Sequence, residues 1–331
     1  TYRTRTILLL GLLTFVFACT IGQPANTQPI FDSTKAALEL EATAMVLQLT
    51  QSAMQNQVAP APTQAPAAAL PPAATVAPAE PTTIPPTVSN MPDFDTWMKS
   101  ASVLLYEDMA SVYDVYRFVP IALEGMGLSY SDQGDALGHF KDQLLSNGPR
   151  GQGWDLVIAS KENRSALQGE FYEYMNTALT NGSSVILEEW DMNRIGYGKL
   201  SLLTGRCGVE FDRDWFDQNL QDTVIYAVNG SHRAHHFPNE GLTLTKVTGY
   251  WLGFDLGDRM RLAPGGDATA LWSLYGKANG GDIVAASCLD DRMIIQTYST
   301  HSYSQDRVVP VWQNYIYSTL RARYDYLAAQ Q

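Results

Sequence analysis

Residues 154–160 (WDLVIAS) and 184–189 (SVILEE) are two continuous apolar runs that end in polar residues. Such runs are typical of strands that are buried on both faces of a parallel sheet. Between them, residues 165–179 have helical spacing and are followed by Asn181-Gly182, a common helix stop. A strand, a helix and a second strand of these lengths predict a βαβ unit with a right-handed crossover.

The chain before this unit repeats the same alternation. Residues 102–106 (SVLLY) form another apolar run, and residues 111–125 carry apolar side chains at helical spacing. Residues 128–131 and 137–146 add a short strand and a helix. This order predicts an α/β fold, with a doubly wound, mostly parallel sheet and helices on both faces.

The second half has a different pattern, in which predicted strands follow one another through turns. Strands are expected at residues 223–228, 242–250, 268–274, 283–287 and 293–298, and a closing helix at 309–324. We expect these strands to extend the sheet and to add an antiparallel lobe. Gly265-Gly266 and Gly280-Gly281 are predicted turns rather than phosphate loops, because no helix follows either pair.

The first twenty residues have the pattern of an export signal. Arg3 and Arg5 precede an uncharged run, residues 6–18 (TILLLGLLTFVFA), which ends at Cys19. This run is shorter than the roughly 20 apolar residues that span a bilayer, and it has the length of a signal-peptide core. Its ending, VFAC, resembles the lipobox of bacterial lipoproteins, although Phe17 is bulkier than usual. We expect cleavage before Cys19 and lipid on that cysteine; a plain signal peptide or an N-terminal anchor is the alternative.

The next seventy or so residues are rich in Ala, Thr, Pro and Gln and nearly lack aromatics, so they cannot bury much apolar surface. Residues 33–57 favour a frayed amphipathic helix, with a short coiled coil as the alternative, and residues 59–92 favour an extended spacer. The predicted parts are a signal peptide (1–18), a lipidated cysteine with its stalk (19–92) and a folded α/β domain (93–331). Such a chain is expected outside the cytoplasm, anchored by lipid to the cell membrane or envelope.

Most of the net charge of −12 belongs to the predicted folded domain. Arg3 and Arg5 supply +2, the stalk −3 and residues 93–331 −11. An acidic domain repels nucleic acid and anionic lipid, so nucleic acid is not expected as a partner. The membrane is expected as a partner only through lipid on Cys19.

Two cysteines remain after Cys19, namely Cys207 and Cys288. In an oxidising compartment an even pair fits a disulfide. Two unpaired core thiols fit equally well, because the sequence does not place the two Cα atoms within bridging distance.

The order of these pieces resembles the class I glutamine amidotransferase-like fold, nearest to its trehalose-utilisation (ThuA)-like branch. The resemblance rests on SVLLYED (102–108), GQGWDLVIASKEN (151–163), NGSSVILEEWD (181–191) and the ending DDRMIIQTYSTHSYSQDRVVPVWQNYIYSTLRARY (290–324). It covers about two thirds of the chain and implies a flavodoxin-like α/β domain. Amidotransferases of this fold carry a nucleophilic cysteine on a strand-to-helix elbow, with a partner histidine. Here residues 192–196 (MNRIG) hold neither cysteine nor serine, so glutaminase chemistry is not expected.

In an open α/β sheet, ligands bind beyond the carboxyl ends of the strands. The residues predicted there, as a candidate ligand-binding or catalytic crevice, are Glu107, Asp108, Glu162, Glu188, Trp190, Asp191 and His301. Paired carboxylates beside an aromatic suit a sugar site or a metal held by oxygen ligands. The alternative is that Glu and Asp end these strands because strands end in solvent. No motif implies a cofactor, and no metal site is predicted.

The three histidines of SHRAHHF, at 232, 235 and 236, do not have a recognised zinc spacing. We expect an exposed polar loop there rather than a transition-metal site.

Three functions fit these observations. The first is a non-catalytic domain, displayed on a stalk, that binds a carbohydrate or a protein. The second is a ThuA-like hydrolase or sugar-modifying enzyme that uses strand-end carboxylates and His301. The third is a structural protein of the cell envelope. The spacer and the missing nucleophile favour the first.

Overall fold

The computed structural model describes residues 91–331 except 113–114, 147, 163–166, 191, 194–198, 217–223, 246–254 and 277–281. The described residues belong to one compact unit, Ile84–Gln331. The predicted signal peptide, Cys19 and the stalk up to residue 90 lie outside them, as does Asp191. Across the part of the chain that is described, no helix is both long and apolar enough to cross a membrane.

One half of the sheet is parallel and carries helices on both faces. Its strands lie in the order β2-β1-β3-β4-β10. Their bounds are β1 Val103–Glu107, β2 Ser131–Asp132, β3 Leu156–Lys161, β4 Ser184–Glu189 and β10 Met293–Gln296. The helices are α3 Phe94–Lys99, α4 Phe118–Gly125, α5 Leu137–Leu145, α6 Glu170–Thr180, α7 Leu200–Cys207 and α8 Gln305–Ala328.

The other half of the sheet is antiparallel. It begins where β9 pairs with β10 and continues through β7 to β5. In a side branch, β8 also pairs with β9, and β6 pairs with β8. These strands are β5 Val209–Phe216, β6 Tyr226–Ala227, β7 Asp255–Leu262, β8 Thr269–Ser273 and β9 Ile283–Cys288. Two single-turn helices, η2 Arg233–His235 and η3 Thr300–Ser302, lie in connections. The prediction of an α/β fold with an added antiparallel lobe is confirmed.

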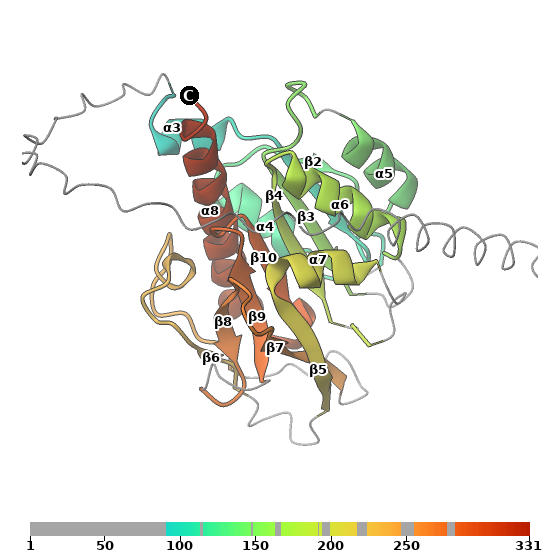
Figure 1. Cartoon of the computed structure of the whole chain (residues 1–331), viewed down its shortest axis with the longest axis vertical. Helices are drawn as coiled ribbons and strands as arrows, with labels where there is room; N and C mark the ends of the chain where they lie inside the picture. The colour runs from blue at the N-terminus through green and yellow to red at the C-terminus, as the bar shows by residue number, and fades with distance from the viewer. Residues whose placement is uncertain are drawn as a thin grey trace, which may run out of the picture. The chain divides into compact units, whose positions relative to one another are not determined.

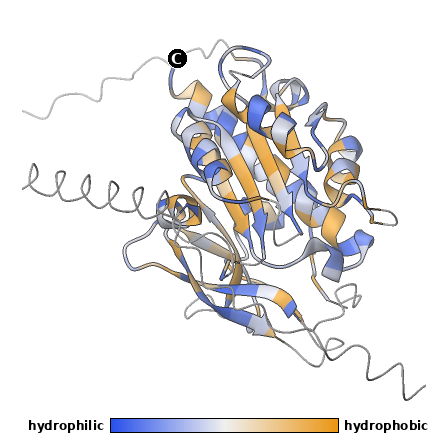
Figure 2. Ribbon diagram, turned by 90° about the vertical axis from the view of Figure 1, so that its right-hand side faces the viewer, coloured by the Kyte–Doolittle hydropathy of each residue, from blue (hydrophilic) through white to orange (hydrophobic). Residues whose placement is uncertain are grey.

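Side-chain alternation along the parallel strands explains why the sheet is covered on both faces. In β1, for example, Val103 and Leu105 belong to one apolar cluster, and Leu104 and Tyr106 belong to a second one on the opposite face. The first cluster includes side chains of α3, α4 and α8, and the second includes side chains of α5, α6 and α7. Figure 1 shows these two groups of helices, and Figure 2 shows how apolar residues concentrate along the central strands.

Several element bounds differ from the predictions. The helix expected over 111–125 begins only at Phe118. Pro120 favours this start, because proline has no N–H to donate and is better tolerated in the first turn of a helix than in its interior. The strand expected at 223–228 is only the two-residue β6. Most of 242–250 lies outside the described residues, although Leu244 forms a bridge with Ile225.

Candidate functional site

A row of polar side chains crosses the parallel strands at their carboxyl ends. The strand register aligns Glu107 with Ser160, Ser160 with Glu188, and Glu188 with Gln296. We refer to these four residues as the carboxyl-end row. All four are at most 3% exposed. Because side chains alternate along a strand, the row points to the same face as Leu105 and Ile186, which α4 and α8 cover.

Glu188 is the most enclosed carboxylate of this row. Its Oε1 atom accepts hydrogen bonds from the Thr300 amide at 2.7 Å, from the Thr300 hydroxyl and from Gln296 Nε2 at 3.1 Å. Its Oε2 atom accepts from the Ser160 hydroxyl. Burial, and then the nearby charge of Glu162, raise the pKa of Glu188 well above its ordinary value.

His301 joins the row through Glu162, the residue that follows β3. Its Nδ1 atom lies 2.8 Å from Glu162 Oε1, and its Nε2 atom lies 2.7 Å from the carbonyl oxygen of Tyr116. A carbonyl oxygen can only accept, so Nε2 donates; a carboxylate also accepts, so Nδ1 donates and the ring is a cation. Burial lowers the pKa of His301, but the hydrogen bond and charge of Glu162 outweigh it and raise that pKa to about 9.

Glu107 has a different partner. Its carboxylate receives a charged hydrogen bond from Arg117, whose guanidinium also holds Asp132 through two bonds of 2.7 and 2.8 Å. Burial raises the pKa of Glu107, and Arg117 partly offsets this. Arg117, which precedes α4, therefore links Glu107 of the carboxyl-end row to Asp132 of β2.

Asp108 and Trp190, two further predicted residues, form hydrogen bonds with the backbone of Glu162. Asp108 Oδ1 accepts from the Glu162 backbone amide at 2.7 Å, and Trp190 Nε1 donates to the Glu162 carbonyl at 3.1 Å. The structure thus brings together Glu107, Asp108, Glu162, Glu188, Trp190 and His301, whereas Asp191 lies outside the described residues. Glu107, Asp108, Glu162, Glu188 and His301 are all buried, so they do not end their strands in solvent.

Glu189, next to Glu188, points to the opposite face of the sheet. There it pairs with Lys161, whose Nζ lies 2.7 Å from Oε1, and it accepts a 2.6 Å hydrogen bond from the Tyr172 hydroxyl. Both side chains of the ion pair are fully buried. The two adjacent glutamates of SVILEE therefore belong to two separate polar networks.

The structure also decides between the alternatives for the cysteines and histidines. Cys207 and Cys288 form a disulfide that links the end of α7 to the end of β9. The prediction of an exposed polar loop around the histidines is wrong for His235, which is 5% exposed, bonds to the Val228 carbonyl and packs its ring edge-on against Trp272. Among the described side chains, no cluster of three or more His, Cys, Asp or Glu is arranged to hold a metal.

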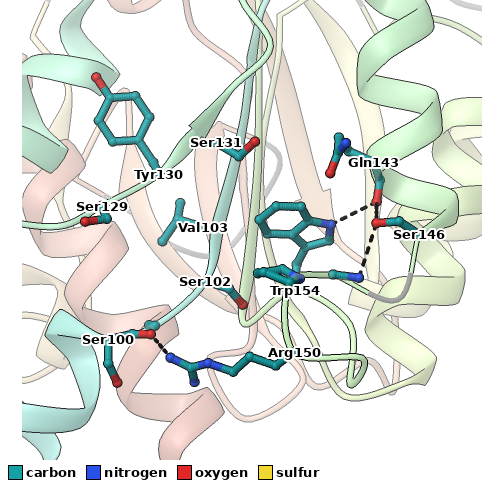
Figure 3. A pocket seen from close by; sticks show the side chains of 13 residues that line it. Ser100, Ser102, Val103, Ser129, Tyr130, Ser131, Gln143, Ser146, Arg150 and Trp154 are labelled. Carbon is teal, nitrogen blue, oxygen red and sulfur yellow. Dashed lines mark hydrogen bonds between the residues drawn. The ribbon is translucent and has the colours of Figure 1, made fainter.

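A pocket that the sequence analysis did not predict lies at the opposite, amino edge of the parallel strands (Figure 3). It is lined by the starts of β1 and β2, by the end of α5 and by residues 148–150 and 154, which precede β3. Its polar side chains include Ser100, Ser129, Ser131, Gln143 and Ser146. The sequence signal was a recurrence of serine in and beside the predicted strands 102–106 and 128–131 and at the end of the predicted helix 137–146, which by itself is typical of ordinary caps and turns.

Comparison with known proteins gives no basis for a family or a function. No family model and no curated protein matches the chain. Among solved structures, the chain is similar to the cold-adapted β-galactosidase of Rahnella sp. R3, with 13% sequence identity and a TM-score of 0.40. The match covers 68% of this chain but only 31% of that enzyme, so the chain spans about a third of its length. A likeness at this level carries no inference about activity or substrate.

Proposed function

We propose that this chain displays a non-catalytic α/β binding domain, for a carbohydrate or a protein ligand, outside the cytoplasm on a stalk anchored by lipid on Cys19. The proposal includes the relationship to glutamine amidotransferase-like and ThuA-like domains. One observation carries it. The carboxylates at the carboxyl edge of the sheet, where an enzyme of this fold would act, are bonded to the domain's own donors.

Glu188 illustrates this best. It accepts four hydrogen bonds from Ser160, Gln296 and Thr300, and a carboxylate offers about four acceptor positions. Glu162 likewise accepts from Ser299 at 2.6 Å and from His301. A carboxylate whose acceptor positions are occupied within the fold stabilises that fold, and it has little capacity left to bind water or substrate.

The test measures binding and turnover on the same protein. Purified full-length chain is screened on a glycan array and in a crosslinking experiment on intact cells. It is also incubated with glutamine and with a set of p-nitrophenyl glycosides. We expect saturable binding of a glycan or a protein and no product above the buffer blank. Measurable turnover of an amide or glycoside would overturn the proposal.

A second candidate function, a hydrolase or sugar-modifying enzyme, is favoured by the convergence of Glu162, Glu188 and His301. Buried groups whose pKa values are shifted, as those of Glu188 and His301 are, are typical of active sites. If an activity is found, Glu188→Gln and His301→Ala should each abolish it. His232→Ala is the matched control, because His232 also lies 2.8 Å from a carboxylate, that of Asp291, in a different part of the domain. Activity that survives both site variants would exclude this candidate.

A further inference from the structure

The pocket at the amino edge of the sheet has the size of a small-molecule site. Its volume is about 710 Å³, within the range of roughly 300–1,000 Å³ that ligand pockets in proteins occupy. Figure 3 shows Tyr130 and Ser129 on one side and Trp154, Gln143 and Ser146 on the other. Ser102 and Val103, at the start of β1, lie between them. The walls therefore come from segments that are far apart in the sequence.

The polar lining consists almost entirely of neutral groups that both donate and accept. Within the described part of the chain, the Gln143 side-chain amide and the Ser129 hydroxyl have no hydrogen-bond partner. Gln143 is bonded through its backbone, whose carbonyl accepts from Trp154 Nε1 at 2.9 Å, from the Ser146 hydroxyl at 2.7 Å and from the Ser146 amide at 3.2 Å. Hydroxyl-rich ligands need neutral partners of this kind, since each hydroxyl donates one hydrogen bond and accepts others.

The pocket also offers apolar surface. Trp154 and Val103 lie beneath the pocket and are buried, and the accessible apolar surface comes from the partly exposed side chains of Tyr130 and Pro149. Aromatic rings suit the C–H faces of a sugar ring, since they combine a flat apolar surface with few rotatable bonds. An apolar wall beside hydroxyls and an amide matches the two chemically distinct surfaces of a pyranose.

Charge argues against an anionic ligand. Arg150 is the one cationic side chain among the lining residues. Its guanidinium already bonds to the Ser100 carbonyl and lies 3.7 Å from Asp155. The domain around it is strongly acidic, and its field repels phosphorylated or multiply carboxylated ligands.

We propose that this pocket, at the amino edge of the sheet and opposite the carboxyl-end row, binds a neutral saccharide of one or two rings. The inference rests on the proposed binding function and names a site and a ligand class for it. Tyr130 and Pro149 provide the apolar wall, and Gln143 and Ser129 provide hydrogen bonds to sugar hydroxyls.

The experiment uses the full-length chain in a detergent without a sugar headgroup. Saturation-transfer NMR is recorded with glucose, galactose, mannose, N-acetylglucosamine, cellobiose and lactose, and with glucuronic acid as the charged comparison. The tightest ligand is then titrated by calorimetry against two variants. Ser129→Trp fills the pocket, and Gln143→Ala removes the amide but keeps the carbonyl that Trp154 needs. Ser231→Trp, at an exposed serine that does not line the pocket, is the matched control.

We expect binding of at least one neutral sugar and weaker binding of glucuronic acid. Ser129→Trp should lower the affinity at least tenfold and Gln143→Ala three- to tenfold, with Ser231→Trp within twofold of the wild type and all variants melting cooperatively. Sugar binding that both pocket variants retain would overturn the assignment of the site but leave the proposed function standing. A protein ligand without any sugar binding would overturn the saccharide class alone. Turnover, or no ligand of either kind, would overturn the proposed function as well.

Discussion

His301 and Glu162 form a buried, charge-assisted hydrogen bond of 2.8 Å between two segments that are 139 residues apart in sequence. Glu162 directly follows β3, and His301 lies in η3, just after β10. The pair therefore ties the end of a central strand to the turn that leads into the last helix. Its first consequence is a dependence of stability on pH.

Because the pKa of His301 is raised from 6.5 to about 9, the folded protein holds this proton more tightly than the unfolded chain does. The stabilisation is fully present below pH 6.5 and is lost as the pH rises through 9. It amounts to a few kcal/mol at most, since one pKa unit corresponds to about 1.4 kcal/mol. Urea unfolding at pH 6 and pH 9.5 should show the loss, and Glu162→Gln should flatten it. An equally steep decline in Glu162→Gln would show that another group is responsible.

The ion pair of Lys161 and Glu189 should be sensitive to the loss of either partner. Lys161→Met leaves a buried carboxylate without its cation, which costs about 3–5 kcal/mol of the free energy of unfolding. The double variant Lys161→Met/Glu189→Leu removes both charges and should recover most of this loss, although Tyr172 then lacks its acceptor. Urea unfolding of the two single variants and the double variant gives the coupling energy directly. If the double variant is no more stable than the single Lys161→Met variant, the cost has another origin.

The disulfide between Cys207 and Cys288 encloses 81 residues of sequence. Closing a loop of that size in the unfolded chain contributes about 2–4 kcal/mol to stability. The Cys207→Ser/Cys288→Ser variant should therefore unfold at a clearly lower urea concentration than the wild type. Peptide mapping without reductant should find the two cysteines in one linked peptide of the wild-type protein. A wild-type protein with two free thiols at these positions would contradict the bond.

The lipid anchor is tested at Cys19. Mass spectrometry of the mature N-terminus should find a diacylated or triacylated Cys19, and the protein should fractionate with membranes. Cys19→Ala should lose the lipid and leave the membrane fraction, since a single extended chain without acyl groups has no comparable affinity for a bilayer. An unmodified Cys19 in the mature wild-type protein would refute the anchor.

The sequence predicted the parallel half of the sheet well because its strands are continuous apolar runs. β4 has the predicted bounds of 184–189, and β3 is shifted only slightly. It did not predict β5 and β7, in which half of the residues are charged and several are exposed. These two strands are held by contacts across the pair, such as Arg261 Nη2 to Glu210 at 2.8 Å, and by a ladder interrupted at two irregularities. Such interruptions break the alternation of apolar and polar residues by which a strand is recognised in a sequence.

For the candidate site, the sequence predicted residues that lie at one edge of the sheet, but not the hydrogen bonds that they form. Strand ends alone bring Glu107, Glu162, Glu188 and His301 to one edge of a parallel sheet. Their hydrogen-bond partners come from Thr300, Gln296 and Tyr116, which the sequence does not connect to them, and so their burial could not be predicted. The pocket at the amino edge was not predicted at all, since serines at turns are too common to indicate a site.

The carboxyl-end row also selects the register in which the parallel strands pair as the chain folds. Apolar runs such as those of β3 and β4 pair almost equally well when they slide past one another, because every position is hydrophobic. A slip of one residue would turn each glutamate to the other face of the sheet, separating Glu188 from Thr300 and Glu189 from Lys161, at a cost of several kcal/mol. The carboxyl-end row on one face and the Lys161–Glu189 pair on the other therefore favour one register of the parallel strands. They destabilise misfolded forms with another register, which the apolar core alone would tolerate.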